Sequence, residues 1–140
     1  MRETILLDTG PLVAFLNRTD RFHEWALAEW ERLRPPFLTC EAVLAEACFL
    51  VRHLPGGSQA VVELLNREVL HSSFVLQEEA EAVAKLLGRY AEVPMSLADA
   101  CLIRMAERHS RSQVLTLDRD FRIYRKHRRH VIPTIMPPQI

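Results

Sequence analysis

The chain contains few cysteines, and no two of them have the spacing of a metal or redox motif. Its three cysteines, Cys40, Cys48 and Cys101, lie in apolar runs and form no C-x-x-C pair. An odd number of cysteines in such positions indicates reduced thiols rather than a disulfide framework. We therefore expect a cytoplasmic protein.

Long hydrophobic runs are also missing. No apolar run approaches the roughly 20 residues that a membrane-spanning helix needs. The N-terminal segment meets Asp8 after only three apolar residues, which is too early for a secretory signal. We therefore expect a soluble chain with no membrane partner.

Neither sign of charge is in excess, because 18 Lys and Arg residues balance 18 Asp and Glu residues. A net charge of zero provides no global attraction for nucleic acid, so such a partner would depend on a local basic patch. The phosphate-loop motif G-x-x-x-x-G-K-[ST] is absent, which disfavours nucleotide binding of that kind. No internal repeat, low-complexity tract or long linker divides the chain.

The chain does contain a regular alternation of short apolar segments and helical patterns. With 140 residues, 49% of them hydrophobic, it is expected to form one domain over residues 1–140. Strands are predicted at 5–7, 37–40, 73–76, 113–117 and around 130–136. Helices are predicted at 11–16, 21–33, 41–53, 58–70, 77–90, 96–109 and 118–127. This alternation predicts an α/β fold with a mainly parallel sheet covered by helices on both faces.

One acid, Glu46, stands in the middle of the apolar segment 39–51 (TCEAVLAEACFLV). A helix there would be largely buried, and an unpaired buried carboxylate costs several kcal/mol. One interpretation is a buried salt bridge to Arg104 or Arg52, which would contribute little stability. The other is that Glu46 belongs to a metal site and is held rigidly by its apolar surroundings.

Three aspartates occupy positions where helix capping is the simplest interpretation. Asp8 and Asp118 each lie between a predicted strand and a predicted helix, and Asp99 ends an S-x-x-D pattern. However, ligands of an open parallel sheet bind beyond the carboxyl ends of its strands. If Glu46 and Asp99 reach that edge, four carboxylates meet there and need a cation. Oxygen ligands select Mg²⁺ or Mn²⁺ over zinc, and such ions promote phosphodiester hydrolysis.

Four segments in order resemble the motifs of the PIN-domain family, and more narrowly those of VapC-type toxins of toxin–antitoxin pairs. They are ILLDTGPLVAFL, TCEAVLAE, SLADACLIRMA and LTLDRDF, which carry Asp8, Glu46, Asp99 and Asp118. The resemblance covers essentially the whole chain. It implies a three-layer α/β/α sandwich around a five-stranded parallel sheet, and Mg²⁺- or Mn²⁺-dependent endoribonuclease activity. It also implies a homodimer that a cognate antitoxin protein inhibits.

Within this hypothesis the acids have different roles. Asp8 and Asp99 are expected to be the principal metal ligands. Glu46 and Asp118 would bind metal through water or orient the attacking water. Asp120 is expected to lie outside the first layer of ligands or to start a helix, although Asp118 and Asp120 could exchange roles.

Groups expected to bind the RNA lie beside these acids. The hydroxyls of Thr9 and Thr116 are expected to form hydrogen bonds with a phosphate or a metal-bound water. The segment 118–130 has a surplus of basic residues, and such a patch would make RNA binding depend on salt. A solvated helix face explains any single one of these basic residues equally well. The candidates for RNA contact are Arg119, Arg122, Arg125 and Lys126.

Other interpretations stay open. A catalytically silent PIN-like binding module would keep the same acids, and a DNA-directed nuclease would use the same metal chemistry. A haloacid-dehalogenase-like phosphatase is disfavoured, because that class needs a second Asp where the chain has Gly10. Apolar stripes within 58–90 are candidates for partner contact, although packing against the sheet is the favoured explanation. In the segment NRTDRFH, Asp20 is expected to cap a helix and His23 to form a local hydrogen bond.

Overall fold

Five short strands form one parallel sheet in the computed structural model, which describes residues 3–140. The strands are β1 (Thr4–Leu7), β2 (Phe37–Leu38), β3 (Leu70–His71), β4 (Ser112–Leu115) and β7 (Thr134–Ile135). Their order is β3-β2-β1-β4-β7, and each neighbouring pair runs in parallel. The longest register joins β1 to β4, from Thr4 opposite Ser112 to Leu7 opposite Leu115. The predicted five-stranded parallel sheet is confirmed.

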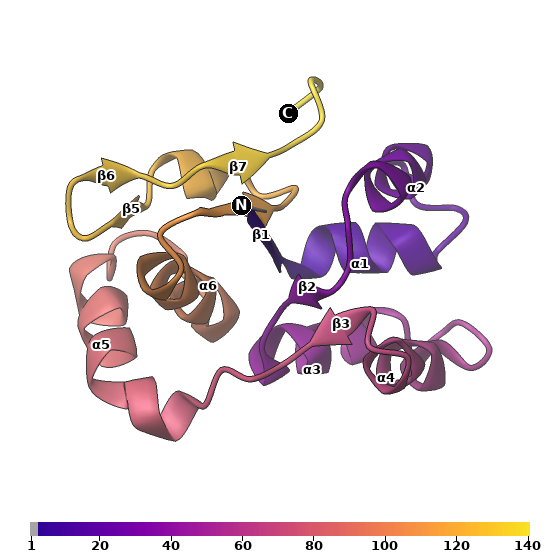
Figure 1. The fold of residues 1–140 in the computed structure, drawn as a ribbon, viewed down its shortest axis with the longest axis horizontal. Coiled ribbons are helices and arrows are strands. Elements are labelled where there is room, and N and C mark those ends of the chain that lie inside the picture. The colour runs from indigo at the N-terminus through magenta and orange to yellow at the C-terminus, as the bar shows by residue number, and fades with distance from the viewer. Residues whose placement is uncertain (1–2) are drawn as a thin grey trace.

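Helices cover both faces of this sheet (Figure 1). They are α1 (Thr9–Leu16), α2 (His23–Arg32), α3 (Glu41–Leu50), α4 (Gly57–Asn66), α5 (Leu76–Arg89) and α6 (Leu97–Arg108). One buried cluster joins the sheet to α5 and α6, a second joins it to α1, α2 and α4, and α3 contributes to both. Within β1, Leu6 belongs to the first cluster while Ile5 and Leu7 belong to the second, because side chains alternate along a strand. The predicted three-layer sandwich is confirmed.

None of the helices within residues 3–140 is long and apolar enough to cross a membrane. All three cysteines are free thiols, as predicted. Cys40 precedes α3 and Cys101 lies in α6, and both belong to the buried cluster beneath α5 and α6. They serve there as small hydrophobic residues.

The third strand lies earlier than predicted. The prediction placed it at 73–76, but β3 is Leu70–His71, and Leu76 already begins α5. The cause is the early end of α4 at Asn66, where Glu68 adopts a left-handed conformation with a φ of 61°. That turn ends the predicted helix and releases the following residues to pair with β2.

The helix predicted at 118–127 is also wrong. The segment instead forms the 3-10 turn η1 (Arg119–Arg122) and the strand β5 (Arg125–Lys126), which pairs with β6 (His130–Val131) in an antiparallel hairpin. His127 and Arg128 have φ values of 49° and 71°, as the turn residues of a tight hairpin do. Phe121 and Tyr124 are fully buried against α6, so tertiary packing overrides the helical pattern.

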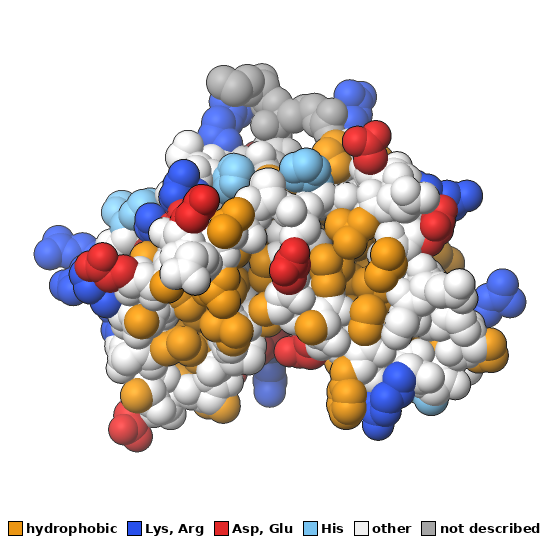
Figure 2. All heavy atoms as spheres, turned by 90° about the horizontal axis from the view of Figure 1, so that it is seen from below, with side chains coloured by type: hydrophobic (Ala, Val, Ile, Leu, Met, Phe, Trp, Pro, Cys, Tyr) orange, Lys and Arg blue, Asp and Glu red, His pale blue; other side chains and the backbone are white. Residues whose placement is uncertain are grey.

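The apolar stripes predicted on α4 and α5 pack mostly against their own fold. Val61, Val83 and Leu86 are buried, while Val62 is 56% exposed. Figure 2 shows hydrophobic side chains gathered on the face at the bottom of Figure 1, among scattered charged residues. The large hydrophobic residues exposed on α3, on α4 and at the start of α5 are Phe49, Leu50, Val62, Val75 and Leu76.

Candidate functional site

Asp8 lies directly after β1, at the carboxyl edge of the sheet, and is buried. Its Oδ1 accepts a hydrogen bond of 2.7 Å from the backbone N–H of Thr9, and Asp8 caps α1 as predicted. Its Oδ2 accepts a hydrogen bond of 2.6 Å from the hydroxyl of Thr116. Burial, together with the charges of Asp99 and Asp118, raises the pKa of Asp8 to about 7, although these two hydrogen bonds oppose the rise.

Asp99 lies in the first turn of α6 and is also buried. It forms a capping box with Ser96: the Ser96 hydroxyl accepts from the Asp99 N–H at 3.0 Å, and Asp99 Oδ2 accepts from the Ser96 N–H at 3.1 Å. The phenol of Tyr124 donates to the same Oδ2 at 3.3 Å. Burial raises the pKa of Asp99, and the neighbouring Asp118 adds to that rise against the hydrogen bonds from Ser96 and Tyr124.

Asp118 is connected to Asp8 through the hydroxyl of Thr116. That hydroxyl donates to Asp8 and accepts a hydrogen bond of 2.9 Å from the N–H of Asp118. Asp118 Oδ1 in turn accepts from the N–H of Asp120 at 2.9 Å and caps η1. Because β1 and β4 are neighbours in the sheet, Thr116 can bind both Asp8 and Asp118 at the carboxyl ends of these two strands.

The predicted burial of Glu46 is wrong, because its side chain is exposed. Only one side of α3 is covered: Val43 and Ala47 are buried, while Phe49 is 59% exposed. Apolar neighbours in sequence therefore did not imply a buried position. The alternative interpretation, a salt bridge from Glu46 to Arg104 or Arg52, is not found within residues 3–140 either.

The two arginines proposed as partners of Glu46 have other contacts. Arg104 donates to Glu79 at 2.6 Å and to Glu107 at 3.2 Å. Arg52 donates to the backbone carbonyl of Phe49 at 2.6 Å, and its guanidinium lies 3.8 Å from the centre of the Phe49 ring. Glu46 thus has no structural role as an ion-pair partner in the described part of the chain.

The four predicted acids nevertheless line one open pocket of about 380 Å³ at the carboxyl edge of the sheet. We call it the acid pocket, and its lining residues are Asp8, Thr9, Gly10, Glu46, Asp99, Leu117 and Asp118. No Lys or Arg belongs to this lining, so the negative charges face one another without a cation. Gly10 allows the backbone after Asp8 to pack closely against Leu117, because a Cβ at residue 10 would lie only 3.1 Å from the Cβ of Leu117.

The donor atoms of the acid pocket suit a hard divalent cation. All are oxygens, which Mg²⁺ and Mn²⁺ prefer. Thr9 is buried, and its hydroxyl has no hydrogen-bond partner in the part of the chain that the structure describes. The hydrogen bonds above use only Oδ2 of Asp99 and only Oδ1 of Asp118. Across residues 3–140, however, no three acidic, His or Cys side chains already converge as a finished metal site.

Asp120 does not line the acid pocket but a neighbouring groove. This outer groove, of about 560 Å³, is lined by Arg21, Phe22, Leu117, Asp118, Arg119, Asp120, Gln139 and Ile140. It shares Leu117 and Asp118 with the acid pocket. The structure therefore distinguishes the two acids that were interchangeable in the sequence: Asp118 lines both hollows and Asp120 only the outer groove.

The basic residues predicted to contact RNA are not equivalent. Arg119 is exposed and lines the outer groove. Arg122 donates to the backbone oxygen of Ile140 at 2.7 Å. Arg125 uses one guanidinium nitrogen on three backbone carbonyls of residues 122–124, and so holds the turn before β5. Lys126 is half-buried in β5.

Two residues of the outer groove, Arg21 and Phe22, were not among the predicted site residues. The neighbouring Asp20 does not cap α2 as predicted, because the N-cap is Phe22 and no side chain caps it. Asp20 Oδ1 instead accepts from the N–H of Phe22 at 2.8 Å, in the turn before the helix. His23 Nδ1 lies 2.7 Å from the carbonyl oxygen of Ala14. The one signal in the sequence was a basic residue beside an aromatic one in a polar turn, which is too common to indicate a site.

Comparison with known proteins agrees with this architecture. Residues 5–126 match the PIN domain family. The crystal structure of VapC20 from Mycobacterium tuberculosis, described as a sarcin–ricin loop cleaving toxin, has a similar fold. The TM-score is 0.75 at 22% sequence identity, over 84% of this chain and 92% of that one. No curated protein sequence matches the chain.

Proposed function

Because the chain belongs to the PIN domain family, we propose that it is a divalent-metal-dependent ribonuclease and the toxin of a toxin–antitoxin pair. The observation that carries this proposal is the acid pocket, in which Asp8, Asp99 and Asp118 come together without a cationic side chain. Burial, and to a smaller extent the neighbouring carboxylates, makes ionisation of Asp8 and Asp99 costly, as their raised pKa values indicate. A bound divalent cation would remove that cost.

The acids divide the task of holding the metal. Asp8 and Asp99 are the principal ligands, because they are the two buried carboxylates of the pocket. Glu46 and Asp118 line the pocket less deeply and act through water, as ligands of bound water or by orienting the attacking one. A bound Mg²⁺ or Mn²⁺ would activate water and offset the charge of the scissile phosphate.

Two threonines complete the pocket without carrying charge. Thr116 donates to Asp8 and accepts from the Asp118 N–H, and these two hydrogen bonds fix the positions of the two acids relative to each other. The Thr9 hydroxyl, which has no partner within residues 3–140, is free to donate to a phosphate oxygen. The capping box of Ser96 fixes the position of Asp99 in the lining of the pocket.

RNA is the proposed substrate class. The likeness in fold to VapC20, which is described as cleaving the sarcin–ricin loop, supports RNA over DNA. The proposed protein partners are a cognate antitoxin and a second copy of this chain. Exposed hydrophobic residues such as Phe49 of α3 and Val62 of α4 support a surface that a partner covers.

The proposal is tested by incubating the native chain with total RNA, and with single-stranded DNA of mixed sequence, in Mn²⁺, in Mg²⁺ and in EDTA. We expect discrete RNA fragments with either metal, none in EDTA, and intact DNA. DNA cleavage at a similar rate would make the chain a DNA-directed nuclease. If neither substrate is cut while the chain still binds RNA, it is a catalytically silent binding module.

A further inference from the structure

The outer groove borders the acid pocket, since Leu117 and Asp118 line both. One wall comes from the turn between α1 and α2 and carries Arg21, and the other is η1 and carries Arg119. An RNA strand with one phosphate in the acid pocket must continue past its rim. The outer groove is the hollow next to that rim, and its volume is within the range of about 300–1,000 Å³ that ligand sites have.

The turn that carries Arg21 is fixed by hydrogen bonds before any ligand arrives. Asn17 Oδ1 accepts from both the N–H and the hydroxyl of Thr19, at 3.1 and 2.9 Å. Asp20 Oδ1 accepts from the Phe22 N–H, and the His23 ring contacts the carbonyl oxygen of the Ala14 residue in α1. A turn held in this way positions its side chains with little loss of entropy on binding.

Arg21 and Arg119 are exposed cations without an acidic partner. Neither forms an ion pair within residues 3–140, although Asp120 lines the same groove. The Arg21 guanidinium lies 4.9 Å from the centre of the Phe22 ring, a cation–π distance that holds the charge at the groove wall. Guanidinium groups bind phosphate through two parallel hydrogen bonds, so two unpaired ones facing a shared groove suit a phosphate.

We propose that the outer groove binds the phosphate next to the scissile one in single-stranded RNA, through Arg21 and Arg119, with Phe22 positioning Arg21. This inference rests on the proposed function. It assigns the groove to the polynucleotide backbone, so its contribution to affinity is independent of base sequence.

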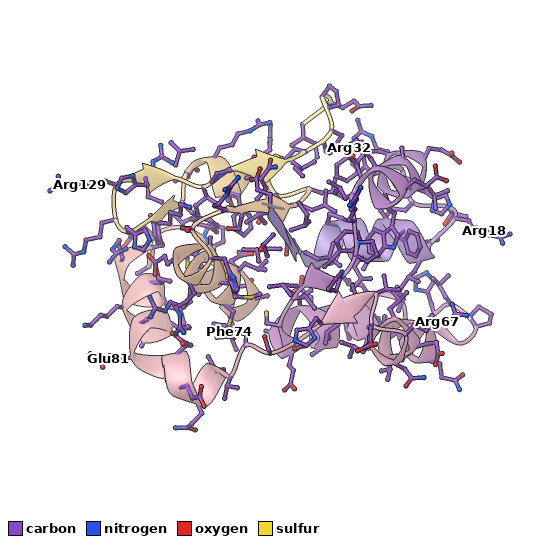
Figure 3. The ribbon with its side chains drawn as sticks, in the orientation of Figure 1. Arg18, Arg32, Arg67, Phe74, Glu81 and Arg129 are labelled. Carbon is purple, nitrogen blue, oxygen red and sulfur yellow. The ribbon has the colours of Figure 1, made fainter. Side chains whose placement is uncertain are left out.

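The test is the salt dependence of binding to a short fluorescent single-stranded RNA, measured in the Asp8→Asn background to prevent cleavage. Each phosphate contact on a single strand contributes about 0.7 to the slope of log affinity against log salt. Arg21→Ala and Arg119→Ala should each lower the slope by about 0.7, and the double variant by about 1.4. The matched control is Arg18→Ala in the same turn, because Arg18 points outward from the molecule (Figure 3). It should leave the slope unchanged.

Phe22 gives an independent check of positioning. Phe22→Leu should weaken RNA binding when Arg21 is present and have no further effect in the Arg21→Ala background. If Phe22→Leu weakens binding equally in both backgrounds, Phe22 acts through folding or direct contact and the positioning role is wrong.

Failure of this inference is distinguishable from failure of the proposed function. If the native chain cleaves RNA with metal but the double variant binds and cleaves like Arg18→Ala, the groove assignment is overturned and the ribonuclease stands. If the native chain neither binds nor cleaves RNA, both are overturned. The thermal response to Mn²⁺ should be the same in the double variant as in the native chain, which shows that the acid pocket is intact.

Discussion

The two ends of helix α6 differ in whether the acidic side chains beside them have cationic partners. At its N-terminal end, Asp99 faces Asp8 and Asp118 across the acid pocket, whose lining includes no cationic side chain. At its C-terminal end, Arg104 and Arg108 both bind Glu79 of α5. The first arrangement leaves repulsion between carboxylates in place, and the second removes it.

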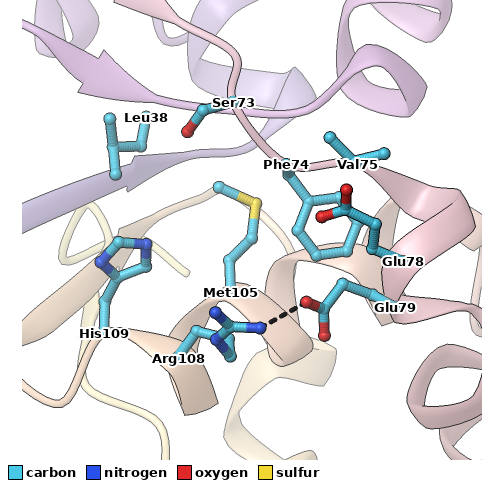
Figure 4. A pocket seen from close by; sticks show the side chains of 9 residues that line it. All are labelled: Leu38, Ser73, Phe74, Val75, Glu78, Glu79, Met105, Arg108 and His109. Atoms are coloured by element: carbon cyan, nitrogen blue, oxygen red, sulfur yellow. Dashed lines mark hydrogen bonds and ion pairs between the residues drawn. The ribbon is translucent and has the colours of Figure 1, made fainter.

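The C-terminal end of α6, where the acid is paired with arginines, also borders a pocket, but this pocket has cationic as well as acidic side chains in its lining. Figure 4 shows the ion pair between Glu79 and Arg108 beside the apolar side chains of Phe74 and Met105. This pocket of about 250 Å³ contains both signs of charge. The ion pairs of Glu79 with Arg104 and Arg108 join α5 to α6 and stabilise the fold. The carboxylates of the acid pocket have no cationic side chain in their lining and could instead bind a metal cation. A hollow by itself therefore says less about function than the balance of charge around it.

Removing a carboxylate from the acid pocket should have the largest effect on activity. Asp8→Asn removes a ligand that stabilises the transition state by several kcal/mol, so RNA cleavage should fall by roughly 100-fold or more. The matched control is Asp120→Asn, which changes an acid of the outer groove only and should retain cleavage within a few-fold. Equal losses in both variants, measured as initial rates with Mn²⁺, would contradict the assignment of Asp118 over Asp120.

Metal should stabilise the native chain through the same acids. At a Mn²⁺ concentration about 100 times the Kd, binding to the folded state alone contributes about 2.7 kcal/mol. The unfolding midpoint should therefore rise with Mn²⁺ in the native chain and in Asp120→Asn, but not in Asp8→Asn or Asp99→Asn. A rise of the same size in all four proteins would place the metal elsewhere.

Removing the ion pairs of Glu79 should lower the stability of the fold and leave the cleavage reaction unchanged. Glu79→Gln leaves Arg104 and Arg108 without their shared carboxylate, and the loss of these part-exposed contacts should cost about 1–2 kcal/mol. Urea unfolding measures this cost. The cleavage rate per folded molecule should stay the same. If activity falls with stability corrected for, the C-terminal end of α6 also takes part in the reaction.

A further expected effect is a pH dependence of stability without metal. The pKa of Asp8 is raised from 3.8 to about 7 on folding, so the folded state binds more protons than the unfolded state between these values. Stability should therefore decrease as pH rises from about 4 to 7. Asp8→Asn removes this contribution and should show a flatter profile in urea unfolding at pH 5 and pH 8. A steeper profile in Asp8→Asn than in the native chain would contradict the raised pKa.

The local part of this architecture could be predicted from the sequence. Asp8 and Asp118 are N-caps and Asp99 belongs to the capping box of Ser96, because short-range patterns determine where helices begin. The same three residues are the aspartates of the acid pocket. The capping and site interpretations were therefore not alternatives. A cap placed at the carboxyl end of a parallel strand lies at the edge where ligands bind.

The parts that failed depend on tertiary partners that no short pattern reveals. Glu46 lies among apolar residues, but α3 leaves one side uncovered, so the acid is exposed. The segment after Asp118 reads as a helix, yet burial of Tyr124 and a tight turn at Arg128 make it a hairpin. Arg21 reaches the site only because the α1–α2 turn folds beside η1.

The most direct test compares the sign of two changes in unfolding free energy, both measured by urea in EDTA at pH 8. If carboxylate repulsion is present at one end of α6 and absent at the other, Asp8→Asn should be more stable than the native chain. Glu79→Gln should be less stable than the native chain under the same conditions. Destabilisation by both substitutions would mean that the acid pocket is already satisfied without a cation, and the central claim would be wrong.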